Sequence, residues 1–202
     1  MTQKFDERNV FLNFPFDKSF EPLLIALVAA LVSIGRKPRS VLQVPQAQAN
    51  RLERLAEAIA ACPVSIHDMS FLGAPVRFNM PFECGLAFGL QLFAQPKGSH
   101  VVLMMERQRH RLWKTLSDVA GRDHIVHARS QRLLITGILA ELGTGATRPP
   151  VPAVLSMCKP LAEVARQHQK DNGTKDVFNP LAFAELVTQA TVLATALGLI
   201  PA

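Results

Sequence analysis

The sequence predicts a doubly wound α/β domain, and three features of the chain support this prediction. Short apolar runs alternate with segments of helical spacing over the first two thirds of the chain. Five of these runs have the length of strands. The 202 residues are 49% hydrophobic and 19% charged, which is enough apolar content for one substantial core. With right-handed crossovers, the alternation predicts a flavodoxin-like, five-stranded parallel sheet of order 2-1-3-4-5, covered by helices on both faces.

The first two strands and their helices follow from apolar runs and from the residues that end them. "NVFLN" at 9–13 predicts a buried strand, and residues 16–35 predict a long apolar helix that ends in glycine. "SVLQV" at 40–44 is expected to be the second strand. Residues 50–62 are expected to form the next helix, because leucines and alanines recur at helical spacing behind Asn50.

The other three strands are predicted in the same way. Apolar runs at 63–68 and 100–106 predict the third and fourth strands, and the segment from Pro81 to Phe93 predicts a helix between them. The fifth strand is expected at 124–128, and a helix at 130–142 closes the series.

The chain is expected to have three parts. Residues 1–142 form the α/β domain, and "GTGATRPPVP" at 143–152 is a linker by composition. Residues 153–202 form a helical extension, with helices expected at 153–170 and 177–199.

Composition limits the setting and the partners. Lysine and arginine outnumber aspartate and glutamate 22 to 16, for a formal charge of +6, which favours an anionic partner. Three widely spaced cysteines predict neither a disulfide framework nor a zinc site, as is typical of a reduced cytoplasm. The charged start is unlike a signal peptide, and the 14-residue run "PLLIALVAALVSIG" is shorter than the roughly 20 residues of a membrane span. We expect a cytoplasmic protein without a membrane partner.

Polar residues gather where the predicted strand order reverses. Ligands of open parallel sheets bind beyond the carboxyl ends of the strands at this point, here between the first and third strands. The first strand runs into "NFPFD" at 13–17, and the third runs into "HDMS" at 67–70. The next loop leads to Glu83, so the sequence predicts one cleft bordered by all three segments.

Glu83 interrupts an apolar helix. From Phe82 to Phe93, only Glu83 and Gln91 are strongly polar, and a helix that is apolar nearly all round is normally buried. Burial raises the pKa of a carboxyl group, whereas a helix N-terminus favours its ionised form, and we expect Glu83 to be ionised at neutral pH. The alternative is an ordinary first-turn glutamate that only stabilises the helix end.

These segments together resemble a known family. "VFLNFPFD", "HDMS" and "FNMPFECGLAFG" are similar to the motif series of nucleoside 2-deoxyribosyltransferases and of the related TIR-like domains that cleave NAD. The resemblance covers roughly residues 8–130, and its most specific part is Phe-Glu-x-Gly-x-Ala at 82–87. It implies that Glu83 attacks or stabilises the anomeric carbon of a ribosyl group while the base leaves, as carboxylates do in retaining glycosidases.

The resemblance also implies roles for other residues. Asp68 would be the second catalytic residue, which orients sugar hydroxyls or positions Glu83; the alternative is a turn cap at a strand end. Phe14 and Phe16 would line the base or sugar pocket, unless they are core residues. The substrate-binding residues expected from the motifs are Asn13, Phe14, Phe16, Asp17, Ser70, Arg77 and Asn79.

Two departures from the family pattern concern the substrate. The deoxyribosyltransferases usually have Asp-Ser-Gly-Thr before the glutamate, where this chain has "RFNM" at 77–80. An arginine in place of an acid favours an anion such as phosphate. The serine or cysteine that many TIR domains have upstream of the glutamate is also absent.

A basic segment follows the fourth strand. Arg107, Arg109 and Arg111 either form a phosphate-binding rim at the strand's carboxyl end or belong to a solvated loop and short helix. Trp113 is placed to stack on a base there. No motif of a nucleic-acid-binding fold accompanies these residues, which argues against a nucleic-acid partner.

A metal or redox cofactor is not expected. His124 and His127 have HxxH spacing, but residues three apart on a strand point to opposite faces. The chain lacks GxGxxG after the first strand, so NAD or a nucleotide would be the substrate and not a redox cofactor.

Two function classes remain open. The first is a hydrolase or transferase that acts on the N-glycosidic bond of a nucleotide, nucleoside or NAD, in bacterial defence or nucleotide turnover. The alternative is a non-catalytic, TIR-like module that senses a nucleotide or self-assembles. The apolar helix at the C-terminus favours a homodimer or larger homo-oligomer in either case.

Overall fold

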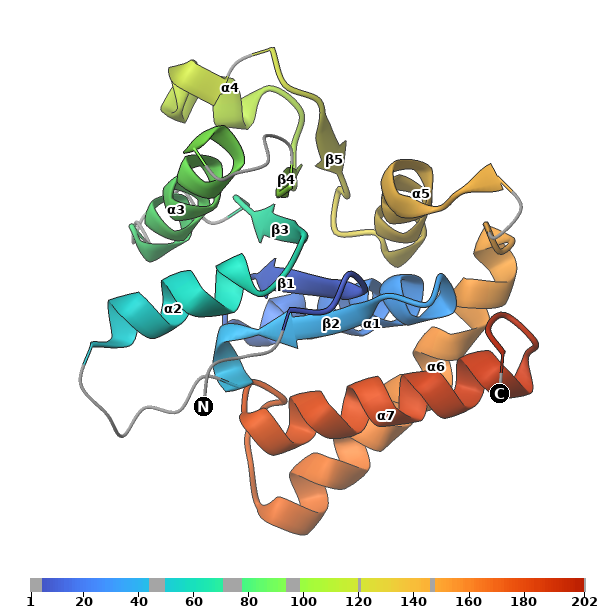
Figure 1. Ribbon diagram of the computed structural model, residues 1–202. Coiled ribbons are helices and arrows are strands. Elements are labelled where there is room, and N and C mark those ends of the chain that lie inside the picture. The colour runs from blue at the N-terminus through green and yellow to red at the C-terminus, as the bar shows by residue number, and fades with distance from the viewer. Residues whose placement is uncertain are drawn as a thin grey trace. The chain divides into compact units, whose positions relative to one another are not determined.

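The computed structural model describes residues 5–43, 50–70, 78–93, 99–119, 121–145 and 148–201. Its sheet has five strands in the order β2-β1-β3-β4-β5 (Figure 1). The strands are β1 (Asn9–Asn13), β2 (Lys37–Ser40), β3 (Val64–Asp68), β4 (Val101–Glu106) and β5 (His124–Val126). The pairs β1–β3, β3–β4 and β4–β5 are parallel. The predicted flavodoxin-like α/β class and its strand order are confirmed.

The two central strands are buried along their whole length. All five residues of β1 and all five of β3 are buried, as in parallel sheets that are covered on both faces. The register pairs Asn13 with His67 and Asp68 with Met105. Parallel pairing therefore brings the carboxyl ends of β1, β3 and β4 to the same edge of the sheet.

The second strand lies earlier in the chain than predicted. We expected it at 40–44, but β2 ends at Ser40, and Val41–Gln43 form a 3-10 turn. The Ser40 hydroxyl accepts a hydrogen bond from the Leu42 amide at 3.3 Å, and the Gln43 side chain accepts one from the Ser40 amide at 3.3 Å. Such local side-chain bonds compete with the strand ladder. Pro38 has no amide donor and is tolerated because β2 is an edge strand.

The chain divides into two compact units. The first consists of residues 1–15 and 39–128 and the second of residues 16–38 and 129–202. The first unit contains α2 (Arg51–Ala60), α3 (Asn79–Phe93) and the short α4 (Arg111–Thr115). Helix α3 packs against α2 and against β1, β3 and β4. The apolar core of this unit includes Phe11, Leu55, Ile59, Met69, Met80, Cys84, Met104 and Leu112.

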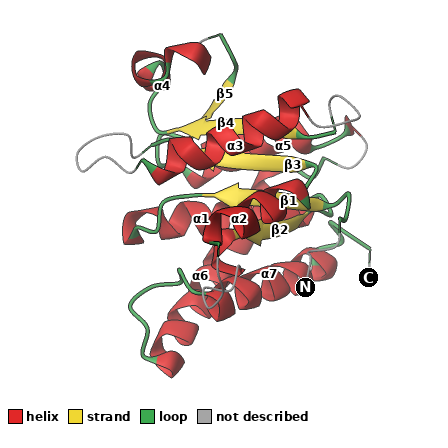
Figure 2. Ribbon diagram, turned by 60° about the vertical axis from the view of Figure 1, so that its left-hand side comes forward, coloured by secondary structure: helices red, strands yellow, loops and turns green. Residues whose placement is uncertain are grey.

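The second unit is helical. It contains α1 (Glu21–Ser33), α5 (Gln131–Leu142), α6 (Val151–Asn172) and α7 (Pro180–Ala196). Helix α1 is buried from Leu23 to Ser33, which matches a helix that is apolar all round, and it contacts α5, α6 and α7. Helices α6 and α7 pack along one another (Figure 2). The two C-terminal helices are thus confirmed, whereas the proposed domain boundary at 143–152 stays a prediction.

Polar side chains cap the first turns of two helices, and the cap at Asn50 was predicted. The Asn50 side chain accepts a hydrogen bond from the Glu53 amide at the start of α2, and the Ser130 hydroxyl accepts one from the Leu133 amide at the start of α5. Within the described residues, no helix is both long and apolar enough to cross a membrane.

Asn179 provides a test of the packing of α7. Its side-chain oxygen accepts a hydrogen bond from the Ala182 amide at 2.9 Å and so caps the helix. Asn179→Ala should lower the free energy of unfolding by about 1 kcal/mol in urea denaturation. Asn179→Asp keeps the acceptor and serves as the matched control, which should unfold at least as late as the native protein. Equal stability of the alanine variant would show that the cap contributes nothing.

Candidate functional site

Glu83 lies on the buried side of α3. It is the fifth residue of the helix, and it stands one turn beyond Met80 and one turn before Ala87, both of which are buried. Only 9% of the Glu83 surface is exposed. Among the described residues, no hydrogen bond or ion pair satisfies its carboxylate. The sequence identified the right residue as unusual, because a nearly buried carboxylate without a partner is costly in free energy.

Burial changes the charge of Glu83. Loss of water around the carboxyl raises its pKa to about 7, and the positive charge of Arg51 at the start of α2 opposes this rise. At pH 7 the protonated and ionised forms are then present in similar amounts, which corrects the expectation of a fully ionised group. The reason is position: the effect of a helix N-terminus falls off within the first turn, and Glu83 lies just beyond it.

Asn13 joins the first strand to the start of α3. Its side-chain nitrogen donates to the Met80 carbonyl at 3.1 Å and also lies 3.0 Å from Nδ1 of His67. A carbonyl only accepts, so the contact with Met80 fixes which atom of the Asn13 amide is the nitrogen. Nδ1 of His67 must then accept the second hydrogen, which leaves the proton of a neutral imidazole on Nε2.

His67 carries a buried donor without a partner. Its side chain is fully buried, and burial lowers its pKa to about 3, so it is neutral. Nε2 has no hydrogen-bond partner within the described residues. His67 was not predicted as a site residue, although it stands in the "HDMS" motif.

His100 shows the structural alternative for a buried histidine. Nδ1 lies 2.8 Å from the Cys62 carbonyl and therefore donates to it, and Nε2 accepts from the Ser65 hydroxyl at 2.9 Å. Both ring nitrogens are satisfied. His100 therefore needs no ligand to account for its burial, unlike His67.

Asp68 belongs to a separate buried cluster. One of its oxygens accepts from the Ser70 amide at 2.9 Å, and the other lies 3.0 Å from Nε2 of His127. The same Nε2 lies 2.9 Å from the Ser70 hydroxyl. A relay that activates serine needs one imidazole nitrogen for the hydroxyl and the other for the carboxylate. Here Ser70 and Asp68 share one nitrogen of His127, so the cluster does not form such a relay. Its hydrogen bonds instead hold the end of β3 to the residue that follows β5.

The other residues that were predicted to bind substrate lie in different places. Phe14 is a core residue, with 3% of its surface exposed. Phe16 belongs to the second unit, where it stacks on Phe178 with ring centroids 5.8 Å apart. Asp17 caps the short helical turn at Lys18–Phe20 through Ser19. Asn79 is exposed at the start of α3, and Arg77 lies outside the described residues.

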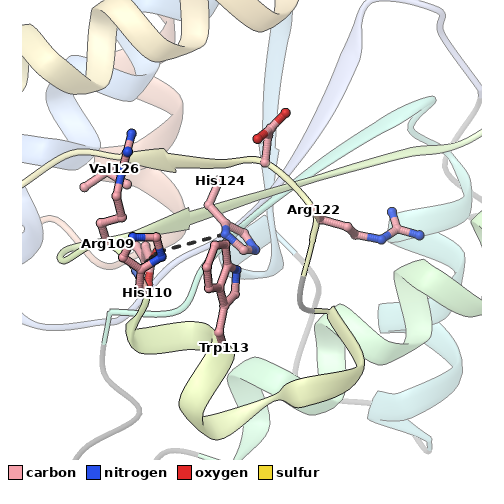
Figure 3. Close-up of a pocket in the computed structure, with 8 residues that line it drawn as sticks. Arg109, His110, Trp113, Arg122, His124 and Val126 are labelled. Atoms are coloured by element: carbon pink, nitrogen blue, oxygen red, sulfur yellow. Dashed lines mark hydrogen bonds and ion pairs between the residues drawn. The ribbon is translucent and has the colours of Figure 1, made fainter.

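A pocket lies beside the carboxyl end of β4 and along β5. Its volume is about 140 Å³, and its lining residues are Glu106, Arg109, His110, Trp113, Arg122, Asp123, His124 and Val126. Arg109 and His110 lie on one side of His124 and Arg122 on the other, with Trp113 below (Figure 3). Arg109 and Trp113 were predicted at such a rim.

The other two predicted rim arginines do not line this pocket. Arg107 is exposed, and Arg111 donates to the Ser70 carbonyl at 3.2 Å. Glu106 and His124 were not predicted to line a binding site. The signal for Glu106 was present, because it is the acidic last residue of an apolar strand, as Asp68 is.

The three cysteines are buried thiols. Burial raises the pKa of the Cys62 and Cys84 thiols to about 12 and that of Cys158 to about 11, so all three are protonated at neutral pH. Among the described residues, no group of three His, Cys, Asp or Glu side chains is arranged to hold a metal ion.

Comparison of the chain with protein-family models, with curated proteins and with solved structures finds no match.

Glu83 should make stability depend on pH. Its pKa is about 7 in the folded protein and near 4.5 in the unfolded chain, so the folded state binds the proton more tightly. Its contribution to stability is fully present below about pH 4.5 and is lost as the pH rises to about 7, with a total change of at most about 3 kcal/mol.

Glu83→Gln removes this dependence, since glutamine does not ionise. The variant should unfold later than the native protein at pH 8, while the difference should shrink toward pH 5. Denaturant unfolding at a series of pH values measures it, and Glu57→Gln on the exposed side of α2 is the control. If Glu83 only stabilised the helix end, Glu83→Gln would unfold earlier than the native protein at pH 8, because the charge of the glutamate would stabilise the helix.

Proposed function

We propose that the protein cleaves the N-glycosidic bond of a nucleotide, nucleoside or NAD, with Glu83 as the group that stabilises or traps the ribosyl centre. The observation that carries this proposal is the buried carboxyl of Glu83, which has no partner among the described residues and has a pKa raised to about 7. Stability alone does not favour such a group. Perturbed carboxyls of this kind concentrate at functional sites.

The chemistry requires the ionised form of Glu83. Departure of the base leaves positive charge on the anomeric carbon, and a carboxylate at this point either stabilises the charge or forms a covalent bond to the carbon. Water or another acceptor then takes the ribosyl group. The low-polarity surroundings of Glu83 strengthen this electrostatic interaction relative to water.

The first turn of α3 brings a second polar group toward the same region. Asn13 bonds to Met80, which precedes Glu83 by three residues, and also to His67. His67 Nε2 is a donor that the described residues leave unsatisfied. We infer that His67 acts through Asn13, whose bonds to His67 and to Met80 position the start of α3 and with it Glu83. Asp68 supports the site indirectly, since its oxygens are engaged by Ser70 and His127.

Base release tests the proposal. Purified protein is incubated with a panel of NAD, nucleosides and nucleotides, and the released base is measured by chromatography. Glu83→Gln should lower the rate by on the order of a thousandfold or more, since it removes an interaction that forms in the transition state. Glu57→Gln should leave the rate unchanged. Equal rates for the native protein and Glu83→Gln would refute the catalytic role.

The pH dependence follows from the same carboxyl. Because the ionised form is active and its pKa is about 7, the rate should fall about tenfold for each pH unit below 7 and should level off above it. A rate that is constant from pH 5 to pH 8 would show that ionisation of Glu83 does not control catalysis.

A nucleotide-binding module without catalysis is the second candidate. The pocket beside Arg109 and Trp113 favours it, because this pocket has cationic and aromatic walls of its own. In this case the protein binds members of the panel but releases no base from any of them.

Self-association is part of both proposals. Leu181 and Val192 are 70% and 58% exposed, and they lie on one side of α7 because eleven residues make about three helical turns. Light scattering should give the mass of a dimer or larger assembly at micromolar concentration. Leu181→Lys combined with Val192→Lys should yield monomers, whereas Thr136→Lys, on an exposed site of α5, should not. A native protein that stays monomeric would contradict this proposal.

A further inference from the structure

We propose that the pocket beside the carboxyl end of β4 and along β5 is a ligand site that binds a small planar heterocycle with a ring N–H and one carboxylate. This site is separate from Glu83, and the proposal does not depend on the N-glycosidic reaction. Four features of the pocket carry it: a fixed wall, a buried acceptor, an aromatic surface and an available cation.

The wall is held in place without a ligand. The two oxygens of Glu106 accept hydrogen bonds from the backbone amides of His110 and Leu112, at 3.1 and 3.0 Å. These bonds tie the loop after β4 back to the strand and support the left-handed backbone of His110, whose φ is 66°. The pocket is thus preorganised, which lowers the entropic cost of binding.

His124 supplies the buried acceptor. Its side chain is 4% exposed, and its Nδ1 lies 4.0 Å from the Glu106 carboxylate. Burial lowers the pKa of His124, so the ring is neutral near pH 7, and the nearby carboxylate favours the proton on Nδ1. Nε2 is therefore an acceptor, and it has no partner among the described residues. A ring N–H of a ligand would satisfy it.

Trp113 supplies the aromatic surface. Its indole is 40% exposed and lies 4.3 Å from the His110 ring, measured between centroids. The indole faces the region of His124 (Figure 3). A planar ligand bonded to His124 can stack on this surface, as aromatic rings prefer.

Arg109 is the available cation. Arg122 is engaged elsewhere, since its guanidinium lies 4.6 Å from the centre of the Phe88 ring and donates to Gln91. Arg109 is exposed and makes no hydrogen bond or ion pair with any residue that the structure describes. A guanidinium matches the two oxygens of a carboxylate. The pocket volume of about 140 Å³ is below the roughly 300 Å³ of pockets for drug-sized ligands, so the pocket itself holds one ring with a substituent.

Fluorescence provides a direct test, because Trp113 is the only tryptophan in the chain. The native protein is titrated with orotate, which has both the ring N–H and the carboxylate. Uracil lacks the carboxylate, and benzoate lacks the N–H. Orotate should quench the fluorescence saturably and bind about tenfold more tightly than either analogue, which is the effect of one charge-assisted hydrogen bond. Calorimetry gives a second measure of the three affinities.

Two matched variants assign the carboxylate contact. Arg109→Gln should weaken orotate binding about tenfold and leave uracil binding unchanged. Arg107→Gln removes a neighbouring exposed arginine that does not line the pocket, and it should bind orotate as the native protein does. Glu83→Gln should also bind orotate normally, which keeps this result independent of the proposed reaction.

Three outcomes would overturn the proposal. The first is the absence of saturable binding of orotate. The second is equal affinity for orotate, uracil and benzoate. The third is an equal loss of affinity in Arg107→Gln and Arg109→Gln, which would indicate attraction by the general positive charge of the protein.

Discussion

Parallel pairing of β1, β3 and β4 is the constraint on which the functional regions depend. It brings three strand ends to one edge of the sheet, and the last residue of each strand there is polar and buried. Asn13 bonds to Met80, Asp68 to the Ser70 amide and Glu106 to the His110 and Leu112 amides. Each strand end thereby holds the segment that follows or faces it. The loops and helices near both candidate sites are fixed by these buried bonds.

The buried acids differ in whether the described structure satisfies them. Asp68 and Glu106 accept hydrogen bonds from backbone amides, so their burial is balanced within the protein. Glu83 lacks such bonds among the described residues, and its pKa is raised accordingly. Asp68 and Glu106 therefore maintain the fold, whereas Glu83 is the carboxylate to which we assign a catalytic role. It also implies that the protein sacrifices stability at Glu83, a common property of functional sites.

The buried histidines divide in the same way. His100 and His127 have hydrogen-bond partners at short distances, and both connect elements of the sheet region. His67 and His124 each leave Nε2 without a partner among the described residues. The first lies beside the start of α3, and the second is the first residue of β5 and lines the pocket there. Residue type alone therefore predicts little about the role of a histidine, whereas the state of both ring nitrogens is informative.

The sequence by itself determined the class of fold, the strand order and most element positions, because these depend on periodicity and on local end signals. Asn50 caps the helix that it was expected to begin, and β1 has the predicted bounds. The sequence also singled out Glu83 through the apolar residues around it. It misplaced β2, since the bonds of Ser40 with Leu42 and Gln43 favour a turn over continued pairing.

Only the tertiary structure decided which polar side chains have partners. Asp68 and His127 are 59 residues apart in sequence, and Asn13 and His67 are 54 apart, so no local pattern reports these contacts. The same holds for the pocket, where Glu106 and His124 come from different strands and Trp113 from α4. Hydrogen bonds and burial depend on distances between segments that the chain brings together only when it folds. Periodicity along the sequence predicts the helices and strands. The packing of those elements determines which groups of the site are charged and which hydrogen-bonding atoms have no partner.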